Sequence, residues 1–143
     1  MARVLKKESV WRVMGAVLAG YASMAFLSVV TIWIIDFFNA ELRTAREMPT
    51  YYFTIVIVTD AIYSVAGGYL CAKIARTAFG NSTIGMIALG ELIAGLSAYS
   101  VWYRVPHWYS LALLLMYPPL VLWGSWLRVQ RAPIKPVLVR VRA

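Results

Sequence analysis

The sequence predicts an all-α integral membrane protein, a bundle of four transmembrane helices that run up-down-up-down with both termini in the cytoplasm. Two observations predict this fold class. Hydrophobic residues make up 62% of the chain and charged residues 14%, whereas soluble domains average about 45–50% and about 25%. The apolar residues also gather into four stretches of about 20 residues, the length that crosses a bilayer as a helix.

The apolar excess also limits the class of protein. A chain of 143 residues is too small to bury this much apolar surface in a core, so the excess must face lipid. This disfavours water-soluble enzymes, DNA-binding modules and disordered proteins, and the strict two-residue alternation of a membrane β-barrel is absent. One cysteine and one histidine leave neither a disulfide framework nor a multi-histidine metal site within the chain.

The first predicted span covers about residues 13–35 and contains no charged residue. It is far longer than the apolar core of a cleaved signal peptide, about 7–15 residues, so we expect it to stay in the protein as a helix. The second span covers about residues 51–72 and contains Asp60. Pro49 precedes it, at a point where a missing N–H costs little.

The third span covers about residues 82–103 and contains Glu91. The fourth covers about residues 108–127 and contains Pro118 and Pro119. Short connections make consecutive helices antiparallel neighbours. We therefore expect a single four-helix transmembrane domain over residues 1–127, followed by a basic cytoplasmic tail over residues 128–143.

The basic residues predict the orientation. If the N-terminus is cytoplasmic, eleven of the 14 Lys and Arg residues lie inside, and only Arg43, Arg46 and Arg104 lie outside. This is a strong positive-inside bias. The net charge of +8 then reflects topology and attraction to anionic lipids at the cytoplasmic face, and it requires no nucleic acid as a partner.

Asp60 and Glu91 are the candidate site residues, because each lies about midway along its span. A charge at this depth costs at least about 2.5–3.5 kcal/mol on insertion scales, so such residues are functional hypotheses by default. Small or polar residues share their helical faces, which points both acids into the bundle. These residues are Tyr63, Ser64 and Gly67 beside Asp60, and Ala94, Gly95 and Ala98 beside Glu91.

The two acids could therefore approach each other, since a short connection joins their spans. Two neighbouring carboxyl groups disfavour double ionisation, and desolvation acts in the same direction. We expect at least one of them to be protonated at neutral pH.

The fourth span adds backbone and hydroxyl groups at the same depth. Pro118 and Pro119 have no N–H, so the carbonyl groups of Leu114 and Leu115 lose their usual helical partners. Tyr117 contributes a hydroxyl group beside them. Interrupted helices at the midplane form ion and substrate sites in many transporters. Proline kinks can also be purely architectural, and a protonated acid can simply hydrogen-bond across a helix interface.

Enzyme signatures are absent: the sequence contains no nucleophile elbow, zinc-protease helix, P-loop or dinucleotide fingerprint. The Gly-x-Gly-Asp motif of membrane aspartyl proteases is also missing. Small multidrug transporters have four short spans, but their key glutamate lies in the first span, which here has no charge. We therefore predict neither catalysis nor a cofactor or bound metal.

Two segments carry a resemblance to known proteins: residues 67–76, GGYLCAKIAR, at the end of the second span, and residues 106–109, PHWY, at the start of the fourth. With them the chain resembles small uncharacterised bacterial inner-membrane proteins of four spans. The resemblance implies a fold and a location in the bacterial inner (plasma) membrane, and no activity.

Two functional hypotheses remain. In the first, the protein is a proton- or cation-coupled carrier that uses Asp60 and Glu91, supported by Tyr63, Ser64 and the residues of the fourth span named above. In the second, it is a non-catalytic membrane subunit or assembly partner in which the acids only hold helices together. Under either hypothesis the protein could form a homo-oligomer or join a larger membrane complex.

Overall fold

The computed structural model describes residues 10–39, 48–75 and 79–131. These residues form four α-helices and no strand: α1 (Val10–Phe38), α2 (Thr50–Ala75), α3 (Phe79–Val101) and α4 (His107–Gln130). Each helix is long and apolar enough to cross a membrane. The predicted all-α class with four membrane helices is therefore confirmed. Of the predicted basic tail, residues 128–130 belong to α4, and residues 132–143 lie outside the described part of the chain.

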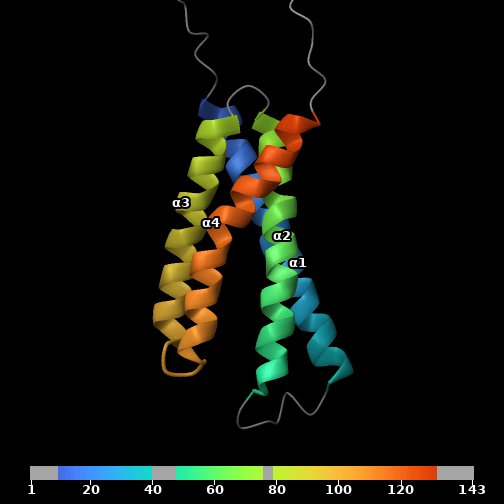
Figure 1. Ribbon diagram of the computed structural model, residues 1–143, viewed down its shortest axis with the longest axis vertical. Coiled ribbons are helices and arrows are strands. Elements are labelled where there is room, and N and C mark those ends of the chain that lie inside the picture. Colours follow the sequence, from blue (N-terminus) through green and yellow to red (C-terminus); the bar gives the residue numbers. More distant parts are fainter. Residues whose placement is uncertain (1–9, 40–47, 76–78, 132–143) are drawn as a thin grey trace, which may run out of the picture.

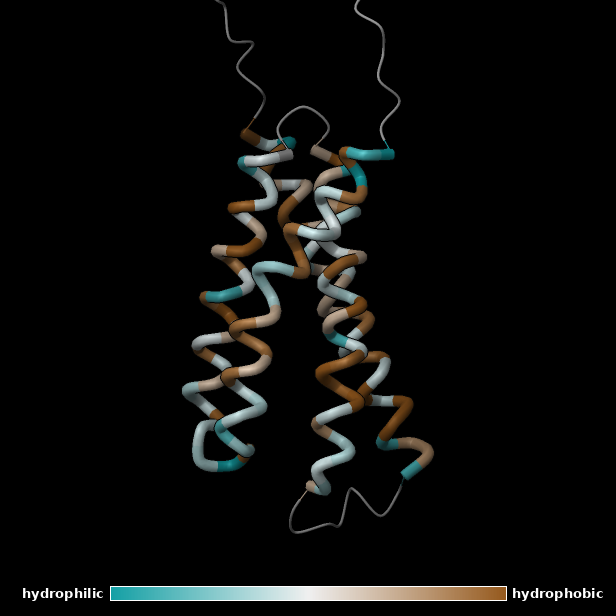
Figure 2. Tube along the Cα trace, viewed as in Figure 1, coloured by the Kyte–Doolittle hydropathy of each residue, from teal (hydrophilic) through white to brown (hydrophobic). Residues whose placement is uncertain are grey.

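The helices alternate in direction, so that α1 begins and α4 ends at the same end of the bundle (Figure 1). Hydrophobic positions occur along the whole length of every helix, and hydrophilic positions gather mainly at the ends (Figure 2). Large apolar side chains project outward from each helix, among them Phe26, Val58, Leu92 and Leu122. In water this surface would be unstable, so the helices contact the lipid bilayer.

The centre of the bundle is the contact between α2 and α4, which is the most extensive between any two helices. Gly68 of α2 abuts the backbone of Val121, and Gly124 of α4 abuts the carbonyl oxygen of Val65. A methyl group on either glycine would overlap backbone atoms of the other helix. Small residues allow such close approach, which is the main source of packing energy between helices in lipid.

A second close approach joins α1 to α2. A Cβ atom built on Gly20 would lie 2.9 Å from the carbonyl oxygen of Gly67 and 2.9 Å from the Cβ of Cys71. The adjacent pair Gly67 and Gly68 therefore lets α2 pack closely on both sides, against α1 and against α4.

The buried core surrounds the crossing of α2 and α4 and includes Val121, which contacts Gly68 there. It combines small residues of α1 and α2 with larger residues of α3 and α4: Ala16, Cys71, Ala75, Met86, Tyr117 and Val121. Toward the opposite end, the buried Phe53 ring of α2 packs against Tyr109 of α4, with 4.9 Å between the ring centroids. A buried core and an aromatic contact thus lie at different depths of the bundle.

Candidate functional site

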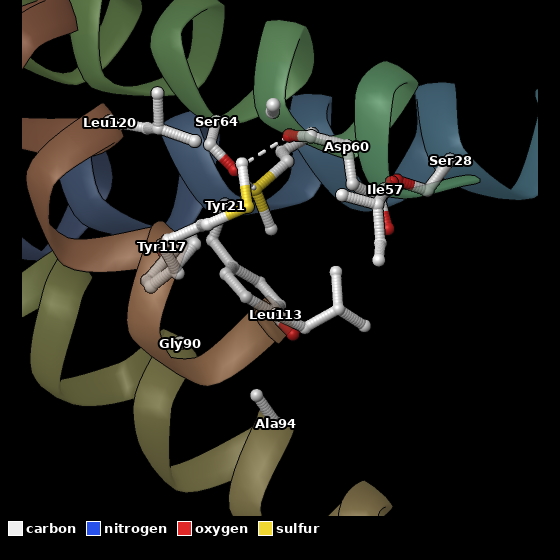
Figure 3. A pocket seen from close by; sticks show the side chains of 13 residues that line it. Tyr21, Ser28, Ile57, Asp60, Ser64, Gly90, Ala94, Leu113, Tyr117 and Leu120 are labelled. Carbon is white, nitrogen blue, oxygen red and sulfur yellow. Dashed lines mark hydrogen bonds between the residues drawn. The ribbon is translucent and has the colours of Figure 1, made fainter. Parts of the chain in front are cut away.

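A cavity of about 120 Å³ lies in the middle of the bundle, between the core and the aromatic contact of Phe53. All four helices contribute to its wall (Figure 3). The wall is mostly apolar and aromatic, with a carboxyl group and a few hydroxyl groups. The lining residues are Tyr21, Met24, Ser28, Ile57, Asp60, Ala61, Ser64, Gly90, Ala94, Leu113, Met116, Tyr117 and Leu120.

Asp60 supplies the only carboxyl group in this wall. The hydroxyl of Ser28 on α1 donates a hydrogen bond to Asp60 Oδ1. Ser28 is the one hydrogen-bond partner of the Asp60 side chain within residues 10–39, 48–75 and 79–131. The carboxyl group therefore has unused hydrogen-bonding capacity beside the cavity, since an ionised carboxylate accepts at two oxygens.

Ser64 lies one turn from Asp60 and also lines the cavity. Its hydroxyl donates to the backbone oxygen of Asp60 at 2.7 Å and lies 3.5 Å from Met24 Sδ. The hydroxyl therefore already has a hydrogen-bond acceptor on α2 and a contact with α1. Ser64 therefore shapes the wall without adding a free donor to the space.

Two tyrosines from different helices face the same space (Figure 3). The hydroxyl of Tyr117 on α4 donates to the backbone oxygen of Met86 on α3 at 3.2 Å. Its ring also abuts Gly90, where a Cβ atom would overlap the ring. Tyr21 of α1 completes the aromatic part of the wall. The cavity thus presents ring surface together with one acid.

Glu91 is not among the lining residues, although Gly90 and Ala94 of the same helix are. Gly90 and Ala94 are four residues apart and share a face, whereas Glu91 lies about 100° further round the helix than Gly90. The Oε1 atom of Glu91 is buried and has no hydrogen-bond partner among the described residues. The structure therefore does not bring the two predicted acids to one cavity.

The remaining predicted supporting residues lie elsewhere, apart from Ser64 and Tyr117. The hydroxyl of Tyr63 lies 2.6 Å from Thr31 Oγ1, in a second polar contact between α1 and α2. Leu114 lines a separate hollow, and 75% of the Leu115 side chain is exposed. Pro118 and Pro119 lie inside a continuous α4, which bends near its middle rather than breaking (Figure 1).

The contribution of α1 was missed by the sequence analysis. Tyr21, Met24 and Ser28 all line the cavity, and their spacing of three and four residues places them on one face of α1. Residues 13–35 contain no charged side chain that would mark this face. A stripe of hydroxyl and sulfur groups in an apolar helix is the signal that could have revealed it.

The chemistry of the cavity is that of one acid in apolar and aromatic surroundings. Such an acid can hold a proton or balance a single positive charge. Within the described residues, no group of three or more His, Cys, Asp or Glu residues could hold a metal ion.

Comparisons of the chain with protein-family models, with curated proteins and with solved structures find no match.

Proposed function

We propose that the protein is a small membrane carrier that exchanges protons or monovalent cations at Asp60. The observation that supports this proposal most is the position of Asp60, whose carboxyl group lines a cavity walled by all four helices. Acids inside the membrane region commonly belong to ion pathways and proton relays.

Energetics favour a neutral Asp60 in the absence of a cation. An interhelical hydrogen bond in a membrane protein contributes about 0.6 kcal/mol on average, whereas a charge at this depth costs at least about 2.5–3.5 kcal/mol. The single bond from Ser28 therefore does not offset ionisation of Asp60. The acid is neutral in the empty cavity, and a cation beside it stabilises the carboxylate.

The contact between Ser28 and Asp60 also favours the second candidate function. Because this hydrogen bond joins α1 to α2, Asp60 could serve only to hold the helices together. The protein would then be a structural subunit of a homo-oligomer or of a larger membrane complex. The two functions differ in whether the titrating proton of Asp60 is needed.

Replacing Asp60 by asparagine is expected to abolish exchange while leaving the fold intact. Asparagine keeps an oxygen that accepts from Ser28 but has no titrating proton. The measurement is dissipation of a pH gradient in proteoliposomes, with Na⁺, K⁺ and small organic amines added in turn. We expect the rate of Asp60→Asn to fall to that of protein-free liposomes.

The matched control is Asp36→Asn, since Asp36 lies near the end of α1 and does not line the cavity. It should retain the parent rate. A parent protein with no activity under any of these conditions, or an Asp60→Asn variant as fast as the parent, would contradict the carrier and leave the structural subunit.

We further propose that the protein lies in the bacterial inner membrane with both termini in the cytoplasm. The distribution of basic residues supports this orientation, with eleven of 14 on the proposed inner side. Those on the inner side would contact anionic lipid headgroups.

Labelling with a membrane-impermeant maleimide tests the orientation. Asn39 follows α1 and Arg131 follows α4, and both are exposed. A cysteine at Asn39 should react in intact cells, and a cysteine at Arg131 should react only after the membrane is opened. The native Cys71 is fully buried and should stay silent. Labelling of the Arg131 position in intact cells would rule out this orientation.

A further inference from the structure

We propose that the central cavity binds one small lipophilic monoamine in its protonated form, with Asp60 as the counter-ion. This inference rests on the proposed function and names its substrate class. It follows from the size of the cavity, the chemistry of its wall and the presence of one carboxyl group.

The volume limits the occupant to a small molecule. The cavity measures about 120 Å³, and an apolar cavity of about 150 Å³ in another protein takes up benzene. An occupant of about five or six non-hydrogen atoms therefore fits. Larger lipophilic cations with several rings do not.

The wall favours an organic cation over a metal ion or an anion. Ca²⁺ requires about six to eight oxygen ligands and Mg²⁺ retains much of its water shell, and this cavity offers one carboxyl group and few hydroxyls. An anion would find no positive charge in the wall, because no Lys, Arg or His among the described residues lines the cavity. By contrast, Leu113 and Met116 provide apolar contact, and the Tyr21 ring can stabilise a cation through its π face.

Binding exchanges one proton for one cation. The neutral Asp60 carboxylic acid loses its proton to the solution, and the resulting carboxylate pairs with the ammonium group, so that the net charge of the cavity does not change. The other titratable groups of the wall are Tyr21 on α1 and Tyr117 on α4. Tyr109, nearer the start of α4, and Glu91, beside the α3 wall, do not line the cavity. Phenols stay neutral near pH 7 and Glu91 does not line the cavity, so Asp60 is the group that releases the proton.

Infrared difference spectroscopy on the full-length protein in lipid films tests this exchange directly. Cyclopentylamine, which has six non-hydrogen atoms, is perfused over the film at neutral pH. We expect loss of the carbonyl band of a protonated carboxylic acid and gain of a carboxylate band, saturating with amine concentration. The Asp60→Asn variant should show no such change, and cyclopentanol, the neutral analogue, should cause none in the parent protein.

A pair of alanine variants tests the location. Ala94→Leu adds three carbon atoms to the cavity wall and should weaken the amine response at least about tenfold, as expected when a charge pair is displaced. Ala98→Leu makes the same change one turn away, in a separate hollow, and should match the parent. Thermal exposure of the buried Cys71 thiol verifies that each variant folds.

The outcomes separate this inference from the proposed function. A carboxyl band that disappears when the pH is raised, but does not respond to amine, would reject the amine and keep proton exchange at Asp60. An amine response of equal size in Asp60→Asn or in Ala94→Leu would reject the cavity as the binding site. A band that depends on neither pH nor amine would reject both proposals.

Discussion

Replacing Gly124 by valine is expected to destabilise the bundle by about 3 kcal/mol or more, at the upper end of the usual cost of overpacking. A Cβ atom at Gly124 would overlap the carbonyl oxygen of Val65 and lie 3.0 Å from the backbone nitrogen of Tyr69. These are backbone atoms of α2, so no side-chain rotation can relieve the overlap. The helices must separate along their most extensive contact.

Gly68→Val should have a similar effect from the other side of the same crossing, because its Cβ atom would overlap the backbone of Val121. The double variant with Gly124→Val should cost less than the sum of the two, since the first substitution already separates the helices.

The single native cysteine provides the measurement. Cys71 is fully buried, so it reacts with a thiol-specific fluorophore only when the bundle opens. We expect its reaction to begin at a markedly lower temperature in Gly124→Val than in the parent. The control is Gly95→Val, because no atom lies within 4 Å of a Cβ atom built there. If Cys71 reacts at the same temperature in Gly124→Val and in Gly95→Val, the α2–α4 contact does not limit stability.

The four helices could be predicted because hydropathy is a local property of the chain. A run of about 20 apolar residues can cross a bilayer as a helix whichever segments pack against it. The crossing points could not be predicted in this way. Gly68, Gly95 and Gly124 all lie within apolar helices. Only the tertiary packing shows that a Cβ atom on Gly68 or Gly124 would overlap another backbone, while one on Gly95 would have no atom within 4 Å.

Those features of the site that depend on one helix alone could also be predicted from the sequence. The depth of Asp60 and the shared face of Ser64 follow from the helical period, and both residues line the cavity. The partner from α1, Ser28, does not follow, because the period of one helix carries no information about which face of another helix it meets. The same limit applies to Glu91, whose depth suggested proximity to Asp60 and whose rotation about α3 leaves it outside the wall.

Replacing Gly90 by valine is expected to cost about 3 kcal/mol and to remove the central cavity in its present form. A Cβ atom at Gly90 would overlap the ring of Tyr117. That ring is 7% exposed and is held by the hydrogen bond from its hydroxyl to Met86. The ring must therefore move, which breaks the hydrogen bond between α4 and α3 and changes the wall beside Asp60.

Thiol exposure of Cys71 and the carboxyl infrared band together measure this effect. We expect Gly90→Val to expose Cys71 at a lower temperature than Gly95→Val does, and to lose the amine response of Asp60 even while folded. Adding Tyr117→Ala to Gly90→Val should restore part of the lost stability, because the overlapping ring is then absent. Tyr117→Ala alone should be destabilising, since it leaves a void in the buried core and the Met86 carbonyl without its donor. If the double variant is less stable than Gly90→Val by the full cost of Tyr117→Ala alone, the two sites act independently, and contact between Gly90 and the Tyr117 ring does not shape the cavity.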